Sequence, residues 1–196
     1  MLRAGAVVGS SLLAFVGALS SAARAGAAGA TAGSATAPCS GADELPSASN
    51  SSVVDAATLC LMNRIRHVYR LRPLRPNGAL SSIATGQARD MVRGSYFGDQ
   101  SLSGQTPLAR IRASSYFLVP SRVRLLTAQN IGWGTGPNAT PSGIVKAWMQ
   151  SPPHRAIILT AAYRDVGVGV APGAPTRFGS SWTGGTYAVE FGERVR

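Results

Sequence analysis

Trp148-Met-Gln-Ser-Pro-Pro-His154-Arg-Ala-Ile-Ile-Leu159 is the stretch of sequence that says most about the fold. Ser151 and Pro152 form a typical helix start, because a serine side chain can cap free backbone amides and proline suits the first helical position. His154 then falls in the first turn of a short helix. The only other histidine, His67, lies among arginines, where we expect a solvated surface residue. His154 is therefore the main candidate for a site residue.

Two longer helices are predicted before this segment, because apolar residues recur there every three or four positions. The first is predicted over residues 53–69, with a capping box formed by Ser52 and Asp55. The second follows Asn77 and ends where Gly94 supplies a left-handed stop.

Threonine-proline pairs at Thr106-Pro107 and Thr140-Pro141 repeat the helix-start signal, so two further helices are predicted there. The C-terminal third changes period, since apolar residues alternate with small or polar ones over residues 166–170 and 187–191. This alternation predicts an antiparallel pair of strands joined by a long loop, and residues 123–133 are predicted as a further strand. Helices followed by strands are typical of an α+β domain.

The first residues of the chain predict its compartment. Arg3 is followed by a small, apolar run up to Ala23, which is too short for a convincing membrane span and is typical of a secretory signal peptide. We expect residues 1–25 to be removed, leaving an extended Ser/Ala/Pro-rich arm over 26–52 and one domain over 53–193. The expectation is a secreted protein with no membrane span after signal cleavage.

The chain has two cysteines, Cys39 and Cys60. In an oxidising compartment an even number of cysteines favours a disulfide over free thiols or a metal pair. We therefore predict a Cys39–Cys60 bond that ties the arm to the first helix. The alternative is that Cys60 is a buried apolar residue and Cys39 is a free thiol.

The chain is strongly basic, with a formal net charge of +11, and Lys146 is its only lysine. Such a charge favours anionic partners. The densest basic patch consists of Arg64, Arg66, Arg70, Arg72 and Arg75. An Ala/Gly/Arg-rich composition also arises from coding bias, in which case these arginines form a solvated helix face. No aromatic residues are interleaved with them as in a nucleic-acid platform, so we expect no nucleic-acid partner.

Several motifs occur in a fixed order along the chain. They are Leu61-Met-Asn-Arg64, Leu74-Arg-Pro-Asn-Gly-Ala-Leu80, Ala88-Arg-Asp-Met91, Tyr96-Phe97, Thr106-Pro107 with Arg110-Ile111, Ala128-Gln-Asn-Ile131, Ala147-Trp-Met149, Ser151-Pro-Pro-His-Arg155 and Val166-Gly-Val-Gly169. Together they resemble the bacterial branch of the CAP superfamily of cysteine-rich secretory proteins, antigen 5 and pathogenesis-related proteins. The resemblance implies an α/β/α three-layer sandwich with a central, mainly antiparallel sheet, and secretion.

In that family a surface cleft is lined by two histidines and two glutamates, which are proposed to bind a divalent metal. The matching positions in this sequence are Asp99, Gln129, Ser151 and His154, so one histidine remains. Zinc favours three or four deprotonated nitrogen, sulfur or carboxylate ligands, and Gln129 is a neutral amide. We therefore expect no metal and no cofactor.

Two functions remain open for the cleft residues Asp99, Gln129, Asn130, Ser151 and His154. The resemblance implies a lipid, a sterol or an anionic wall polymer as ligand, and we expect a monomeric, non-catalytic binding protein. In it, His154 and Gln129 hydrogen-bond to each other or to backbone. The alternative is a secreted hydrolase or metal-dependent enzyme, in which His154 is a general base with Asp99 and Ser151. Against it, Ser151 is expected to serve as the helix cap.

Overall fold

The computed structural model describes residues 37–118, 124–176 and 183–195, which belong to one compact unit. The predicted signal peptide and the first part of the arm, up to residue 36, lie outside the described residues. In the part that is described, no helix has the length and hydrophobicity needed to cross a membrane.

A four-stranded sheet forms the middle of the domain, with the strand order β1-β3-β4-β2. The strands are β1 (Arg75–Pro76), β2 (Arg124–Thr135), β3 (Asp165–Pro172) and β4 (Gly184–Val195). β4 pairs antiparallel with both β3 and β2, which confirms the predicted pair and the predicted further strand. β1 pairs parallel with β3, and its two residues are too few to leave a pattern in the sequence.

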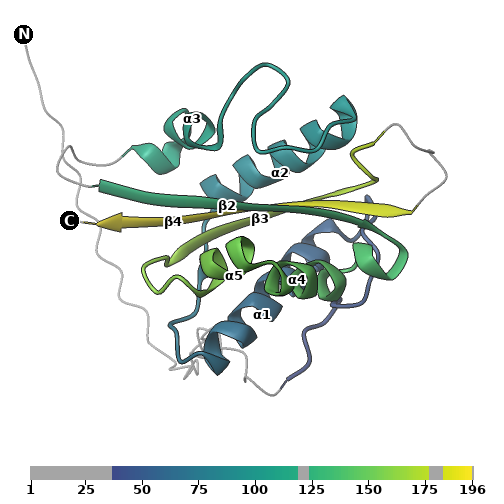
Figure 1. Ribbon diagram of the computed structural model, residues 1–196, viewed down its shortest axis with the longest axis horizontal. Helices are drawn as coiled ribbons and strands as arrows, with labels where there is room; N and C mark the ends of the chain where they lie inside the picture. Colours follow the sequence, from purple (N-terminus) through teal and green to yellow (C-terminus); the bar gives the residue numbers. More distant parts are fainter. Residues whose placement is uncertain (1–36, 119–123, 177–182, 196) are drawn as a thin grey trace, which may run out of the picture. The chain divides into compact units, whose positions relative to one another are not determined.

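Helices cover both faces of this sheet (Figure 1). One face is covered by α2 (Gly78–Gly94) and α3 (Pro107–Arg112), and the other by α1 (Ser51–Val68), α4 (Pro141–Gln150) and α5 (Pro152–Leu159). Two short 3-10 helices, η1 (Ser115–Phe117) and η2 (Gly136–Ala139), complete the elements of the described residues. The result is the predicted α/β/α sandwich with a mainly antiparallel sheet.

Valine and glycine alternate along β3, so the valines face one side of the sheet and the glycines face the other. Val166, Val168 and Val170 are buried in the core that the sheet forms with α1, α4 and α5. A Cβ atom at Gly167 or Gly169 would overlap the backbone of α2. The glycines therefore let α2 pack directly against the strand.

The predicted helix starts are confirmed in three of five cases. Asn77, Thr106 and Thr140 each accept hydrogen bonds from backbone amides at the beginning of α2, α3 and α4. The capping box at Ser52 is wrong, because α1 begins at Ser51 and its N-cap residue is Asn50. The fifth start, at Ser151, is described with the site.

The end of α2 also differs from the prediction. Gly94 is the last helical residue, and the left-handed conformation belongs to Ser95, which has a φ of 51°. A Cβ at Gly94 would press against the ring of Tyr96. The glycine is therefore explained by close packing rather than by its backbone angles.

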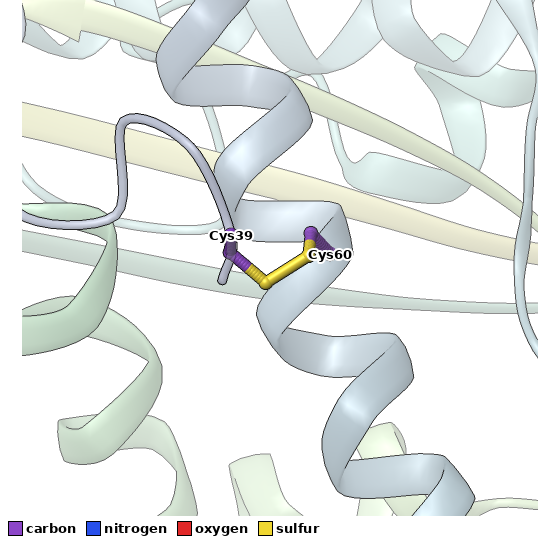
Figure 2. Close-up of a disulfide and its surroundings, with 2 residues drawn as sticks. All are labelled: Cys39 and Cys60. Atoms are coloured by element: carbon purple, nitrogen blue, oxygen red, sulfur yellow. A yellow bond between two sulfur atoms is a disulfide. The ribbon is translucent and has the colours of Figure 1, made fainter. Parts of the chain in front are cut away.

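The predicted disulfide between Cys39 and Cys60 is confirmed, and Figure 2 shows it joining the arm to α1. The Cα atoms of the two cysteines are 5.8 Å apart, so the alternative of a free thiol is wrong. A crosslink between positions separated by 21 residues restricts the unfolded chain and contributes on the order of 3 kcal/mol of stability.

Arg66 does not belong to a solvated helix face, although the exposed Arg64 and His67 do. Its side chain is fully buried. The guanidinium donates hydrogen bonds to four backbone carbonyls, those of Arg72, Ile158, Thr160 and Tyr163, at 2.7–3.2 Å. It therefore fixes the ends of α1 and α5 to each other instead of attracting an anion.

Candidate functional site

His154 is the third residue of α5, and its ring contacts the hydroxyl of Ser151. The distance between Ser151 Oγ and His154 Nδ1 is 2.7 Å. Ser151 is the N-cap residue of α5 by position, but its side chain makes no capping hydrogen bond. The expectation that the cap occupies this hydroxyl is therefore wrong, and the hydroxyl is bonded to the imidazole ring instead.

Asn130 connects strand β2 to the helix that carries His154. The Asn130 side chain is fully buried, and its Nδ2 donates to the backbone oxygen of His154 at 3.1 Å. Because alternate residues of a strand point to opposite faces, the side chain of Gln129 lies on the other side of the sheet from that of Asn130. The two neighbouring amides therefore serve different layers of the sandwich.

Gln129 is bonded to a carboxyl group that the sequence analysis did not single out. Gln129 and Glu190 are directly opposite each other on β2 and β4, and Gln129 Nε2 donates to Glu190 Oε1 at 2.5 Å. Gly167, on the other side of Glu190 in the sheet, faces α2, so this pair lies on the face covered by α2 and α3. Gln129 thus contacts Glu190, and no hydrogen bond joins it to His154 in the described residues.

Glu190 is a fully buried acid, and its burial has a chemical consequence. Burial raises the pKa of Glu190 from its ordinary value of 4.5 to about 7, while the hydrogen bond from Gln129 and the charge of Arg110 oppose the rise. Glu190 Oε2 and Gln129 Oε1 are both buried without a hydrogen-bond partner among the described residues. A proton on Glu190 supplies the missing donor, because a neutral acid and an amide can bond to each other reciprocally.

Asp99 is exposed, in the segment between α2 and α3. Its backbone oxygen accepts a hydrogen bond from Arg110, and its charge acts on Glu190 and Arg110. The five candidate residues therefore fall into two groups. Ser151, His154 and Asn130 meet at α5, whereas Gln129 and Asp99 belong to the face with α2 and α3, together with Glu190.

The comparison with known families identifies the domain. Residues 59–189, which are more than half of the chain, match the model of the cysteine-rich secretory protein (CAP) family. The chain belongs to the CAP family. The CAP protein is also 32% identical, over 124 residues, to the uncharacterized protein YkwD of Bacillus subtilis strain 168; the match covers 63% of this chain and 42% of YkwD. The chain thus spans less than half of that relative.

Solved structures with the same fold come from several bacteria. An extracellular protein containing an SCP domain from Bacillus anthracis is 21% identical with a TM-score of 0.56, over 72% of this chain and 40% of its own. An outer surface protein of Borrelia burgdorferi is 20% identical with a TM-score of 0.54, over 70% of this chain and 90% of its own. A cysteine-rich secretory protein of Staphylococcus aureus is 20% identical with a TM-score of 0.53, over 75% of this chain and 40% of its own. These similarities support the CAP fold.

The residues of this CAP protein do not fit the divalent metal that the family resemblance implies. In the described part of the chain, no three His, Cys, Asp or Glu side chains are grouped so that they could hold a metal ion. The amide of Gln129 is bonded to Glu190, and the Nδ1 atom of His154 is bonded to Ser151. The side chains that could bind a metal at Gln129 and His154 are therefore already hydrogen-bonded to other residues, and too few of them are grouped together to form a metal site.

The CAP protein has an apolar groove between α1 and α4, with a volume of about 400 Å³. Its walls include Leu61, Ile65 and Val68 from α1 and Val145 and Met149 from α4. Val68, the last residue of α1, leaves 77% of its surface exposed. The groove therefore offers apolar surface to a hydrophobic ligand.

Two cations lie close to this groove. Lys146 lines it and also lines a neighbouring hollow beside η2. Met149 lines the groove and a second hollow, of about 290 Å³, which includes Arg155 on α5. Arg155 donates to the hydroxyl of Tyr69 at 2.7 Å and so connects α5 to the end of α1. The apolar surface thus continues to the helix of His154, with positive charge on its rim.

Proposed function

We propose that this chain is a secreted, non-catalytic CAP protein that binds an anionic lipid of the cell envelope. The observation that carries the proposal is the apolar groove between α1 and α4 with Lys146 and Arg155 on its rim. An acyl chain would cover the apolar walls, and the negative headgroup would be attracted to the two cations. A sterol offers no such charge, and a wall polymer offers no apolar chain for the groove.

Burial of the exposed groove residues supplies the free energy for binding. Covering apolar surface is worth roughly 25 cal/mol per Å². The formal net charge is +11 for the full sequence and +9 without Arg3 and Arg24 of the predicted signal peptide, so it adds a favourable long-range attraction for an anion. Recognition at this site therefore needs no reaction and no metal, in keeping with the donor set at Gln129 and His154.

Secretion is supported by three observations. The Cys39–Cys60 disulfide is typical of an oxidising compartment. The sequence before it has the features of a signal peptide, and the similar structures from Bacillus anthracis and Borrelia burgdorferi are described as extracellular or outer surface proteins. Detection of the chain in the culture medium, with an N-terminus near Gly26, tests the localisation.

Calorimetric titration with palmitate and with its neutral analogue hexadecanol tests the ligand. We expect palmitate to bind more tightly than hexadecanol, and Lys146→Gln to reduce that preference. Val68→Glu should weaken palmitate binding about tenfold or more, because it places a carboxylate in the groove. Leu102→Glu is the matched control, since Leu102 is 73% exposed and lies outside the groove. No palmitate binding, or equal losses in the two variants, would refute the proposal.

A hydrolase remains the second candidate, because the Ser151 hydroxyl lies 2.7 Å from the His154 ring. The arrangement has weaknesses as an active site. Asp99 belongs to the other group of residues, and the prolines at 152 and 153 remove two backbone amides that a helix start could offer to an oxyanion. His154→Ala should leave palmitate binding intact and would abolish turnover in an enzyme, so ester hydrolysis lost in this variant would favour the second candidate.

A further inference from the structure

A polar pocket of about 340 Å³ lies between α2, α3 and the segment that connects them. Helices α2 and α3 lie on the opposite side of the sheet from α1 and α4 (Figure 1). The pocket shares no lining residue with the apolar groove and is separate from it. Its polar lining includes Gln87, Asp90 and Arg93 from α2, Ser101 and Ser103 from the connecting segment, and Arg110 from α3. The volume is at the lower end of the range of pockets for small ligands, which is about 300–1,000 Å³.

Arg110 is held in a fixed position at this pocket, and its hydrogen bonds within the described residues go to backbone carbonyls rather than to a carboxylate. Its Nη1 donates to the backbone oxygen of Gln105 at 2.9 Å, and its Nη2 donates to that of Asp99 at 2.8 Å. Both acceptors are neutral carbonyls, and each of the two Nη nitrogens carries a second N–H group beyond the one that is bonded. Glu190 lies near, but its carboxyl group accepts from Gln129 instead. A half-buried, positioned guanidinium with a second N–H on each Nη is a suitable anchor for an anion.

The connecting segment is ordered by its own hydrogen bonds. Ser101 and Gln105 bond to each other twice, through Ser101 N to Gln105 O at 3.1 Å and Gln105 N to Ser101 Oγ at 3.0 Å. Gln100 Nε2 donates to Gly104 O at 2.7 Å, and Gly104 has a φ of +85°, which favours glycine. The hydroxyls of Ser101 and Ser103 are 2.9 Å apart. The connecting segment therefore presents a preformed pair of hydroxyl groups, those of Ser101 and Ser103, to the pocket.

We propose that this pocket binds a carboxylate-bearing saccharide. Arg110 and Arg93 take the carboxylate, the serine hydroxyls exchange hydrogen bonds with the sugar hydroxyls, and Asp90 accepts from them. Serine hydroxyls can donate and accept, as the hydroxyls of a sugar do, whereas a carboxylate accepts. Ile83 is the one large apolar side chain that the pocket offers among the described residues, so a lipid has little surface to cover there.

Two methyl glycosides test the proposal, methyl β-glucuronide and methyl β-glucoside, which differ in a carboxylate at C6. The protein is the complete secreted chain labelled with ¹⁵N, and binding is followed by amide shifts in NMR spectra. We expect the glucuronide to bind about tenfold or more tightly than the glucoside, as for a charge-assisted hydrogen bond. The largest shifts should lie in residues 99–105 and at Arg110. Equal affinities, or shifts elsewhere, would overturn the proposal.

Arginine variants locate the charge. Arg110→Gln and Arg93→Gln should each weaken glucuronide binding and leave glucoside binding nearly unchanged. Arg93 is exposed, so its replacement keeps the test valid if Arg110→Gln disturbs the loop. Arg89→Gln is the control, because Arg89 is an exposed arginine of α2 outside the pocket. An equal loss in the control would indicate a general charge effect and refute the site. Inorganic phosphate that binds as tightly as the glucuronide would refute the saccharide.

Discussion

Replacement of Glu190 by glutamine tests whether this buried acid of β4 is protonated in the folded chain. Glu190→Gln keeps the shape of the side chain, and the new amide can accept from Gln129 Nε2 while it donates to Gln129 Oε1. The substituted pair therefore satisfies both side chains without a bound proton. At acidic pH, where Glu190 is neutral, the variant should be about as stable as the natural chain.

The expected pH dependence follows from the raised pKa. Burial places the pKa of Glu190 at about 7 in the folded chain, compared with an ordinary value of 4.5. An acid whose pKa is higher in the folded chain than in the unfolded chain contributes its full stabilisation below the unfolded-state pKa. This contribution is lost as the pH rises through the folded-state pKa. The difference corresponds to ~3 kcal/mol of the free energy of unfolding. Burial also raises the pKa of Asp55 to about 7, against the charge of Arg89, so Asp55 adds to the same trend.

Urea denaturation followed by circular dichroism, in steps from acidic to mildly alkaline pH, measures the effect. The free energy of unfolding of the natural chain should fall across this range, and that of Glu190→Gln should fall by ~3 kcal/mol less. Asp55→Asn should remove a further part of the slope. Asp43→Asn, at an exposed position, should leave it unchanged. Parallel profiles for the natural chain and Glu190→Gln would show that Glu190 is not protonated in the fold.

Three other predictions concern stability and metal binding. Arg66→Met should lower the free energy of unfolding by about 3–5 kcal/mol, because four carbonyls lose their donor. The control Arg64→Met, at an exposed position, should change it by less than about 0.5 kcal/mol. Urea midpoints measure both variants, and similar losses would contradict the role of Arg66. Gly169→Ala should lower the melting temperature sharply or prevent folding, because the added Cβ overlaps α2, and a thermal scan unchanged from the natural chain would disprove this contact. Calorimetry of the purified protein with zinc should reveal no sub-micromolar affinity, and tight binding would show that the donor set is wrongly assigned.

Local patterns in the sequence were sufficient for most of the fold. The Asn77, Thr106 and Thr140 caps depend on a few neighbouring residues, so sequence signals locate them directly. The start of α1 was misplaced because Ser52 already lies within the helix, and Oδ1 of the N-cap residue Asn50 accepts from Ser47 N rather than from the helix. A capping signal indicates which residue can cap, but the preceding chain decides whether its side chain is free.

The candidate site was harder to predict, because its contacts join distant positions. Gln129 and Glu190 meet only through the register of β2 and β4. One signal for Glu190 was present, since it shares its face of the strand with the small residues Ala188 and Gly192, and a charged side chain buried there needs a partner. Likewise, the arginine run contained no sign that Arg66 alone turns inward, because its four acceptors include three carbonyls more than ninety residues away.

Helix α5 is only eight residues long, and isolated helices shorter than about 12–15 residues are marginal in water. Two buried side chains from other elements bind its ends. Asn130 donates to the His154 carbonyl at the beginning, and Arg66 donates to the Ile158 and Thr160 carbonyls at the end. The helix therefore cannot fray without breaking bonds inside the domain. Its hydrogen-bonded amide protons should exchange with deuterium slowly, at the rate set by opening of the whole domain. A ligand that reaches His154 would meet a rigid surface, with no ordering entropy left to lose there.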